Sequence, residues 1–126
     1  SICDKDSREI DEKDREYLWD TIVKTEAQNV LITHGTFTMT DTAKFLEKKL
    51  EADSIGKRII FTGSMIPVVG FANADAAFNL GYSLASFEAV ESGVYICMNG
   101  GIFNAETVSK NPDLLRFEHN VTEEIN

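Results

Sequence analysis

Three short apolar runs, separated by longer amphipathic stretches, set the pattern of this chain. The runs are Val30–Ile32, Lys57–Thr62 and Val94–Met98. Their length and their β-branched residues are typical of buried parallel strands. The stretches with apolar residues at helical spacing predict helices over about 12–25, 41–52 and 74–90. Strands that alternate with helices in this way form repeated βα units, so we expect a parallel sheet with right-handed crossovers.

The ends and faces of the predicted helices also leave signals. Asp11 is placed to cap the first helix, with Asp14 in its first turn, and Thr40 is the expected N-cap of the second, whose unit Gly56 ends. In the third, small residues are expected to pack against the sheet while larger ones add bulk. The small residues are Ala74, Ala77, Gly81 and Ala85, and the larger ones are Phe78, Leu84 and Phe87.

Glycine turns follow the first two strands. The first is Thr33-His34-Gly35-Thr36 and the second begins at Gly63. In an open α/β sheet, ligands bind where such turns meet at the carboxyl ends of the strands. Gly35 allows a sharp bend that exposes backbone N–H groups, and threonine hydroxyls crowd the turn. The same threonines could also merely close the turn and cap a helix, and spacing alone leaves both interpretations open.

The totals indicate a single globular domain over residues 1–126. Of these, 43% are hydrophobic and 10% aromatic, which is enough to form a core. The pattern starts on a loop and a helix, so we expect a first strand to lie upstream; without it a sheet edge stays unpaired. The charged tail at 112–126 is expected to be a surface arm or linker.

Charge and cysteine content restrict the partners. The formal net charge of −9 argues against nucleic acid and against an anionic membrane surface. Cys3 and Cys97 are far apart in a chain with no sign of export, so reduced thiols and a cytoplasmic location are expected. Neither His34 nor His119 has metal-ligand spacing, and we expect neither a metal nor another cofactor.

Four motifs, in unbroken order, resemble the L-asparaginase/glutaminase family of threonine amidohydrolases. They are the LITHGTFTM stretch from Leu31 followed by Thr42-Ala43, KRIIFTGSM from Lys57, ADAAFNL from Ala74, and GVYICMNGGIF from Gly93. The match runs from Lys5 to about Asn111. It implies an α/β fold with an open parallel sheet and helices on both faces, flavodoxin-like or Rossmann-like, as in the N-terminal domain of that family. It also implies a homodimer or higher homo-oligomer.

The resemblance assigns roles to individual residues. Thr36 corresponds to the second catalytic threonine of the family, and Lys57 to the lysine that activates its hydroxyl. A threonine hydroxyl needs such a base, and burial can lower the pKa of a lysine enough to serve. Ser7 resembles the serine that binds the substrate α-carboxylate. The turn at Thr33, Gly35 and Thr36 would supply backbone donors. Ser64 would present a carbonyl to the substrate amide.

The chain also departs from the family pattern. No T-G-G-T-I segment with the primary nucleophile occurs, and the family's second domain is not present in this sequence. The substrate-binding acidic residue after the second threonine is replaced by Phe37, whose ring offers at most a weak cation–π contact to an ammonium group.

Two functional hypotheses follow. The first is an amidohydrolase domain that acts on the side-chain amide of L-asparagine or a related small amide through Thr36 and Lys57. The second is a non-catalytic relative that binds a small ligand, such as an amino acid, or an interaction partner; Phe37 favours it. A flavodoxin-like binder of a phosphate-bearing ligand has little support, because no glycine-rich phosphate loop is present.

Overall fold

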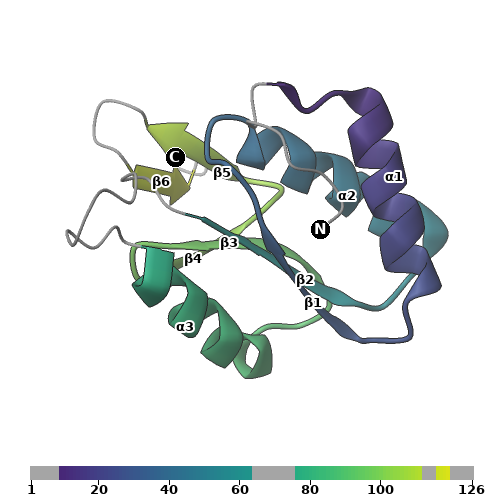
Figure 1. The fold of residues 1–126 in the computed structure, drawn as a ribbon. Helices are drawn as coiled ribbons and strands as arrows, with labels where there is room; N and C mark the ends of the chain where they lie inside the picture. The colour runs from purple at the N-terminus through teal and green to yellow at the C-terminus, as the bar shows by residue number, and fades with distance from the viewer. Residues whose placement is uncertain (1–8, 64–75, 112–115, 120–126) are drawn as a thin grey trace, which may run out of the picture.

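The structure, a computed structural model, describes residues 9–63, 76–111 and 116–119 (Figure 1). Its elements are α1 (Glu12–Lys24), β1 (Asn29–Thr33), α2 (Met39–Asp53), β2 (Arg58–Thr62), α3 (Ala76–Ser86), the short 3₁₀ helix η2 (Phe87–Ala89), β3 (Gly93–Met98), β4 (Gly101–Asn104), β5 (Val108–Asn111) and β6 (Arg116–His119). The three predicted strands and three predicted helices are therefore present, with ends that shift by a few residues.

The main sheet has the strand order β1-β2-β3-β4. β1, β2 and β3 are parallel, with Asn29 opposite Arg58 and Thr33 opposite Thr62. β4 is antiparallel to β3, so the sheet is mixed rather than purely parallel. Asn99 and Gly100 form the tight turn between these strands, both at positive φ. Asn-Gly is a strong hairpin signal. The sequence therefore already carried evidence for β4.

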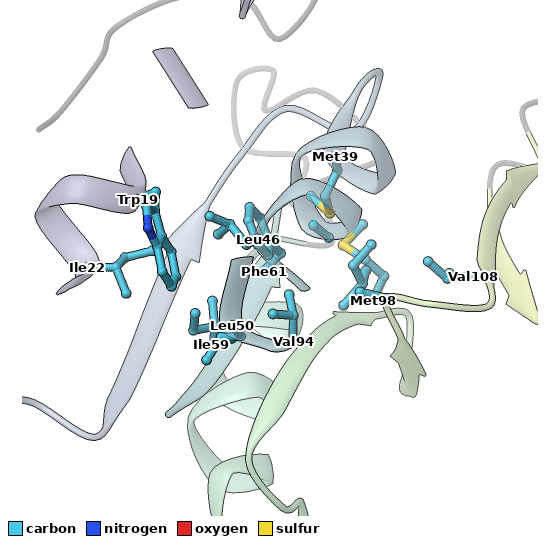
Figure 2. Close-up of a cluster of buried hydrophobic side chains, with 13 residues drawn as sticks. Trp19, Ile22, Met39, Leu46, Leu50, Ile59, Phe61, Val94, Met98 and Val108 are labelled. Atoms are coloured by element: carbon cyan, nitrogen blue, oxygen red, sulfur yellow. The ribbon is translucent and has the colours of Figure 1, made fainter. Parts of the chain in front are cut away.

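α1 and α2 cover one face of the sheet, and α3 covers the other (Figure 1). The larger core lies under α1 and α2. There Trp19 and Ile22 of α1 pack with Leu46 of α2 and with Ile59 and Phe61 of β2 (Figure 2). The smaller core contains Ile60, Phe87 and Cys97. Helices on both faces of one sheet confirm the expected three-layer α/β fold.

The two crossovers between the parallel strands have opposite hands. Both step in the same direction across the sheet, from β1 to β2 and from β2 to β3, yet α2 and α3 lie on opposite faces. The expectation of right-handed crossovers throughout is therefore wrong. A left-handed crossover is rare in parallel βαβ units. Here it leaves a single helix, α3, on its face of the sheet in the described part of the chain.

Several side chains of α3 lie differently from the prediction. Phe78 and Leu84 are 59% and 57% exposed, and Gly81 has open space where a Cβ would be. Asn79 and Ser83, in contrast, are fully buried, so polar groups with backbone partners take the inward face. Phe87, just after the helix, is buried in the smaller core as expected, whereas Ala74 and the side chain of Ala77 lie outside the described part of the chain.

Helix ends also differ in detail. The capping box of Asp11 and Asp14 at the start of α1 is confirmed, with each side chain accepting from the other's backbone N–H at 3.0 Å. α2 has its N-cap at Thr38 rather than Thr40, and its C-cap is Ser54 in the left-handed region, two residues before Gly56. Side-chain caps thus fix α1 more firmly than α2.

The remaining expectations concern the tail, the thiols and the membrane. Within 112–126, expected to be an arm or linker, residues 116–119 form β6 and pair with β5. Cys97 is a free, buried cysteine, and burial raises the pKa of its thiol; Cys3 lies outside the described residues. Within the described ranges, no helix has the length and apolar character that a membrane span requires.

Candidate functional site

The carboxyl ends of β1, β2 and β3 converge at one edge of the sheet. The turn after β1 runs from His34 to Thr38, Gly63 follows β2, and Asn99 follows β3. Thr33 and Thr62 end their strands side by side, and the Thr62 hydroxyl donates to the carbonyl of Cys97 in β3 at 2.9 Å. The predicted meeting of the glycine turns is therefore found in the structure.

Gly63 allows two of these turns to touch. A Cβ on this residue would stand 2.4 Å from the carbonyl oxygen of His34, a distance that side chains do not tolerate. His34 is also tied to β2 by its backbone N–H, which donates to the carbonyl of Thr62 at 3.0 Å. The glycine after β2 is thus required by close backbone approach, and it fixes the spacing of the site.

The side chain of Asn79 in α3 joins the residues that follow β2 and β3 by hydrogen bonds. Its amide nitrogen donates to the carbonyl of Gly63 at 2.9 Å and approaches the sulfur of Met98 at 3.5 Å. Its amide oxygen accepts from the backbone N–H of Asn99 at 2.7 Å. Sequence reasoning included Asn79 in a motif without giving it a role. The available signal was a lone amide within an otherwise apolar helix, which has to be satisfied once it is buried.

The ring of His34 forms hydrogen bonds both within the turn after β1 and to α2. Its Nδ1 is 2.7 Å from the carbonyl oxygen of Gly35, and its Nε2 is 3.0 Å from the hydroxyl of Thr42. That buried hydroxyl also accepts from Nε of Arg15 at 3.0 Å. Burial lowers the pKa of His34, and Arg15 lowers it further, against the opposing effects of the Gly35 carbonyl and of Asp41. A neutral imidazole is therefore favoured near pH 7.

Thr36 and Phe37 occupy the outer part of the turn, just before α2. Thr36 is half-buried, whereas Phe37 is 64% exposed. The start of α2 directs its first backbone N–H groups toward this edge, a favourable place for a carboxylate. Of the substrate-binding candidates, Gly35 lies in the same turn and Thr33 ends β1 just before it. Ser7 and Ser64 lie outside the described residues.

Lys57 is not brought to this site. It precedes β2, whereas Thr36 follows the end of β1, and the levels of Lys57 and Thr62 differ by about 17 Å along a parallel strand. The buried Lys57 ammonium donates to the carbonyls of Thr25 and Ala27, at the end of α1 and in the loop before β1. The structure therefore contradicts the Thr36–Lys57 pair and gives Lys57 a structural role.

The described part of the chain contains no cluster of side chains suited to binding a metal ion. No group of three or more His, Cys, Asp or Glu side chains is placed to hold an ion there. What the edge does offer is threonine hydroxyls and backbone N–H groups. Such groups bind and polarise a small polar ligand.

Comparison with known proteins shows which family the chain resembles. Residues 1–114 match the family described as asparaginase, N-terminal. The chain is 40% identical over 94 residues to the glutaminase-asparaginase of Acinetobacter glutaminasificans, a match that covers 72% of this chain and 27% of that protein. It is 30% identical over 102 residues to L-asparaginase 2 of Escherichia coli (strain K12), covering 74% of this chain and 28% of that protein. The chain thus spans little more than a quarter of the length of these relatives.

Solved structures agree with the sequence matches. The thermostable L-asparaginase from Thermococcus kodakarensis superposes with a TM-score of 0.76 at 26% identity, covering 92% of this chain and 36% of that one. L-asparaginase I from Vibrio cholerae gives a TM-score of 0.72 at 26% identity, covering 85% and 33%. The likeness to the first of these structures extends over almost the whole chain. The chain therefore belongs to the asparaginase family, and residues 1–114 correspond to its N-terminal domain.

Proposed function

We propose that this domain binds a small amino-acid amide at the carboxyl edge of the sheet and takes part in hydrolysis of its side-chain amide, with Thr36 as the acting hydroxyl. The observation that carries the proposal is the turn from His34 to Thr38. It is held by its neighbours on β2 and α2, and it places a half-buried threonine directly before the N-terminus of a helix. The names of the relatives, glutaminase-asparaginase and L-asparaginase, support the substrate class.

The base for Thr36 has to come from this end of the sheet, which excludes Lys57. β5 begins at Val108, a buried residue that shares a hydrophobic cluster with Met39 at the start of α2 and Met98 at the end of β3 (Figure 2). Lys110 follows two residues later on the same strand. The backbone of Lys110 therefore continues the strand that begins in the cluster with Met39 and Met98. We assign to Lys110 the activating role that the resemblance had given to Lys57.

Ammonia release from L-asparagine and L-glutamine tests the proposal. We expect Thr36→Ala and Lys110→Met to reduce turnover by at least a hundredfold, because each removes a reacting group. Lys57→Met serves as the matched control, since it deletes the same ammonium at the opposite end of the sheet. Turnover that survives Thr36→Ala, or that is lost only with Lys57→Met, would overturn this assignment.

A second candidate function is binding of an amino acid without turnover. Phe37 favours it, since a phenyl ring stands where the resemblance expects the carboxylate that holds the substrate ammonium. Calorimetric titration with L-aspartate and L-asparagine separates the two functions. Binding that depends on the turn, together with no ammonia release from any variant, would establish this second function in place of the first.

A further inference from the structure

Four residues form a continuous chain of hydrogen bonds behind the turn. Nε of Arg15 in α1 is 3.0 Å from the hydroxyl of Thr42 in α2. The same hydroxyl is 3.0 Å from Nε2 of His34, and Nδ1 of His34 is 2.7 Å from the carbonyl oxygen of Gly35. The chain thus connects α1, α2 and the residue that precedes Thr36. No side chain in it takes part directly in the proposed chemistry.

The direction of every proton in this chain follows from the groups at its two ends. Arg15 can only donate, so the Thr42 hydroxyl accepts from it. The Gly35 carbonyl can only accept, so Nδ1 of His34 carries a proton. In a neutral ring Nε2 then has a lone pair, and it accepts the remaining proton of the Thr42 hydroxyl. Of the two neutral tautomers of His34, only the Nδ1–H form therefore matches all of these donors and acceptors.

The surroundings of the ring favour the same neutral state. Burial disfavours the imidazolium and lowers the pKa of His34, and the Arg15 guanidinium acts in the same direction. Asp41, at the start of α2, and the Gly35 carbonyl oppose these effects without outweighing them. The ring of Phe61 packs against the imidazole in an edge-to-face arrangement, with ring centroids 5.7 Å apart. A second proton on Nε2 would also meet a hydroxyl that already accepts from Arg15.

The state of His34 controls the peptide next to Thr36. The bond from Nδ1–H holds the carbonyl of Gly35 toward the imidazole ring. No described peptide bond is cis, and in a trans peptide the N–H points opposite to the carbonyl. The backbone N–H of Thr36 is therefore turned away from the ring. Rotation of this peptide would move both that donor and the neighbouring threonine side chain.

We infer that Arg15 and Thr42 are positioning residues: they fix His34 as the neutral Nδ1–H tautomer, and through it they hold the Gly35–Thr36 peptide in one orientation. The significance for catalysis rests on the proposed function, but the proton arrangement does not. The relay differs from packing alone because it predicts which nitrogen carries the proton. It also predicts that a guanidinium on another helix adds to the effect of burial in lowering the pKa of the ring.

Nitrogen-15 spectra of the histidine side chains test the relay directly. The chain has two histidines, and a His119→Gln variant identifies the signal of His34. We expect a protonated Nδ1 and an Nε2 whose shift shows hydrogen-bond acceptance near pH 7. Thr42→Val removes the hydroxyl at nearly constant shape and should move Nε2 toward the shift of a free lone-pair nitrogen. Thr42→Ser keeps the hydroxyl and should restore the original shift.

A second pair of variants tests the charge. Arg15→Met should raise the pKa of His34, since it removes a cation that disfavours the imidazolium, whereas Arg58→Met removes a cation at the amino end of β2 and should leave it unchanged. An Nε2–H tautomer in the native protein, or an unchanged His34 spectrum in Thr42→Val, would overturn the inference. If Thr42→Val does not fold, the native tautomer and the Arg15→Met titration decide the question alone.

Kinetic measurements on the same variants test the positioning role separately. If Thr36-dependent ammonia release is found, Thr42→Val should lower kcat about tenfold with little change in KM, because a displaced hydroxyl reacts poorly once the substrate is bound. Thr42→Ser should recover most of the loss. Absence of turnover in every protein would refute the proposed function and leave the relay to be judged by the spectra. An unchanged kcat in Thr42→Val would refute the positioning role.

Discussion

The two ends of the parallel sheet are held in different ways. At the amino end, charged side chains tie loops together: Lys57 donates to the carbonyls of Thr25 and Ala27, and Arg58 donates to the carbonyl of Val90 at 2.8 Å. At the carboxyl end, the neutral side chains of Asn79 and Thr42 hold the turns, and the Arg15 guanidinium bonds to Thr42 rather than to a turn. Cations therefore bind loop carbonyls directly at the amino end, whereas neutral side chains hold the turns at the carboxyl end.

This contrast shows why a lysine in a matching motif was misplaced. The two ends of a parallel sheet differ in chemistry, and in open α/β sheets ligands bind at the carboxyl ends of the strands. Lys57 and Thr36 belong to opposite ends. The variants below test whether support at one end can be removed without disturbing the other, beginning with the largest expected loss of stability.

Asn79→Leu is expected to be the most destabilising change. Leucine fills a similar volume but leaves the carbonyl of Gly63 and the N–H of Asn99 without their buried partner, so we expect a loss of about 3 kcal/mol in the free energy of unfolding. Chemical denaturation measures it. Ser83→Ala is the control on the same helix, because that hydroxyl bonds to the carbonyl of Asn79 within α3 and to the Cys97 thiol but to neither turn, and its loss should cost about 1 kcal/mol. Equal losses would mean that Asn79 acts through helix packing and not through the turns.

Lys57→Met should cost less, about 1–2 kcal/mol. The substitution keeps an unbranched side chain of similar length, and water can replace the ammonium at the exposed Thr25 and Ala27. Ligand binding at the other end of the sheet should be unchanged in the folded variant. Denaturation and calorimetric titration on the same samples measure both quantities. A loss of binding without a loss of stability would contradict the separation of the two ends.

Whether a feature of the fold or the site could be predicted from the sequence depends on how far apart along the chain the interacting residues lie. Local signals predicted the strands at Val30, Ile59 and Val94 and the capping box at Asp11, because apolar runs and caps act between near neighbours. The separation of Lys57 from Thr36 was also within reach, since one precedes its predicted strand and the other follows its own.

The burial of polar side chains on α3 could not be predicted from the sequence. Its apolar and small residues fit a helix packed on a sheet, and what buries Asn79 is a pair of backbone groups from Gly63 and Asn99, distant in sequence. The hydrogen bond from Thr42 to His34 likewise depends on how α2 lies over the end of β1. Such pairings are tertiary, so periodicity and propensity do not reveal them.

We expect the free energy of unfolding to depend on pH through the titration of His34. Its folded-state pKa is lowered, so between that value and about 6.5 the unfolded chain binds more protons at this residue than the folded chain does. Its contribution to stability is therefore complete above about pH 6.5 and is lost as the pH falls through the folded-state pKa. We expect the stability of the native protein, relative to His34→Gln, to decrease from pH 7 to pH 5. A difference that is flat or rises over this range would contradict a lowered pKa.

Phe37→Asp should change stability least and binding most selectively. Phe37 is 64% exposed, so its replacement should alter the free energy of unfolding by no more than about 0.5 kcal/mol. A carboxylate at this position can accept from the ammonium of an amino acid, and a charged hydrogen bond of this kind corresponds to roughly tenfold tighter binding of L-aspartate. Phe37→Asn is the matched control, because it has the same shape as aspartate without the charge. Calorimetry that shows a gain for Asp and none for Asn would place the ammonium subsite at the outer rim of the turn; an equal response in both variants would place it elsewhere on the carboxyl edge.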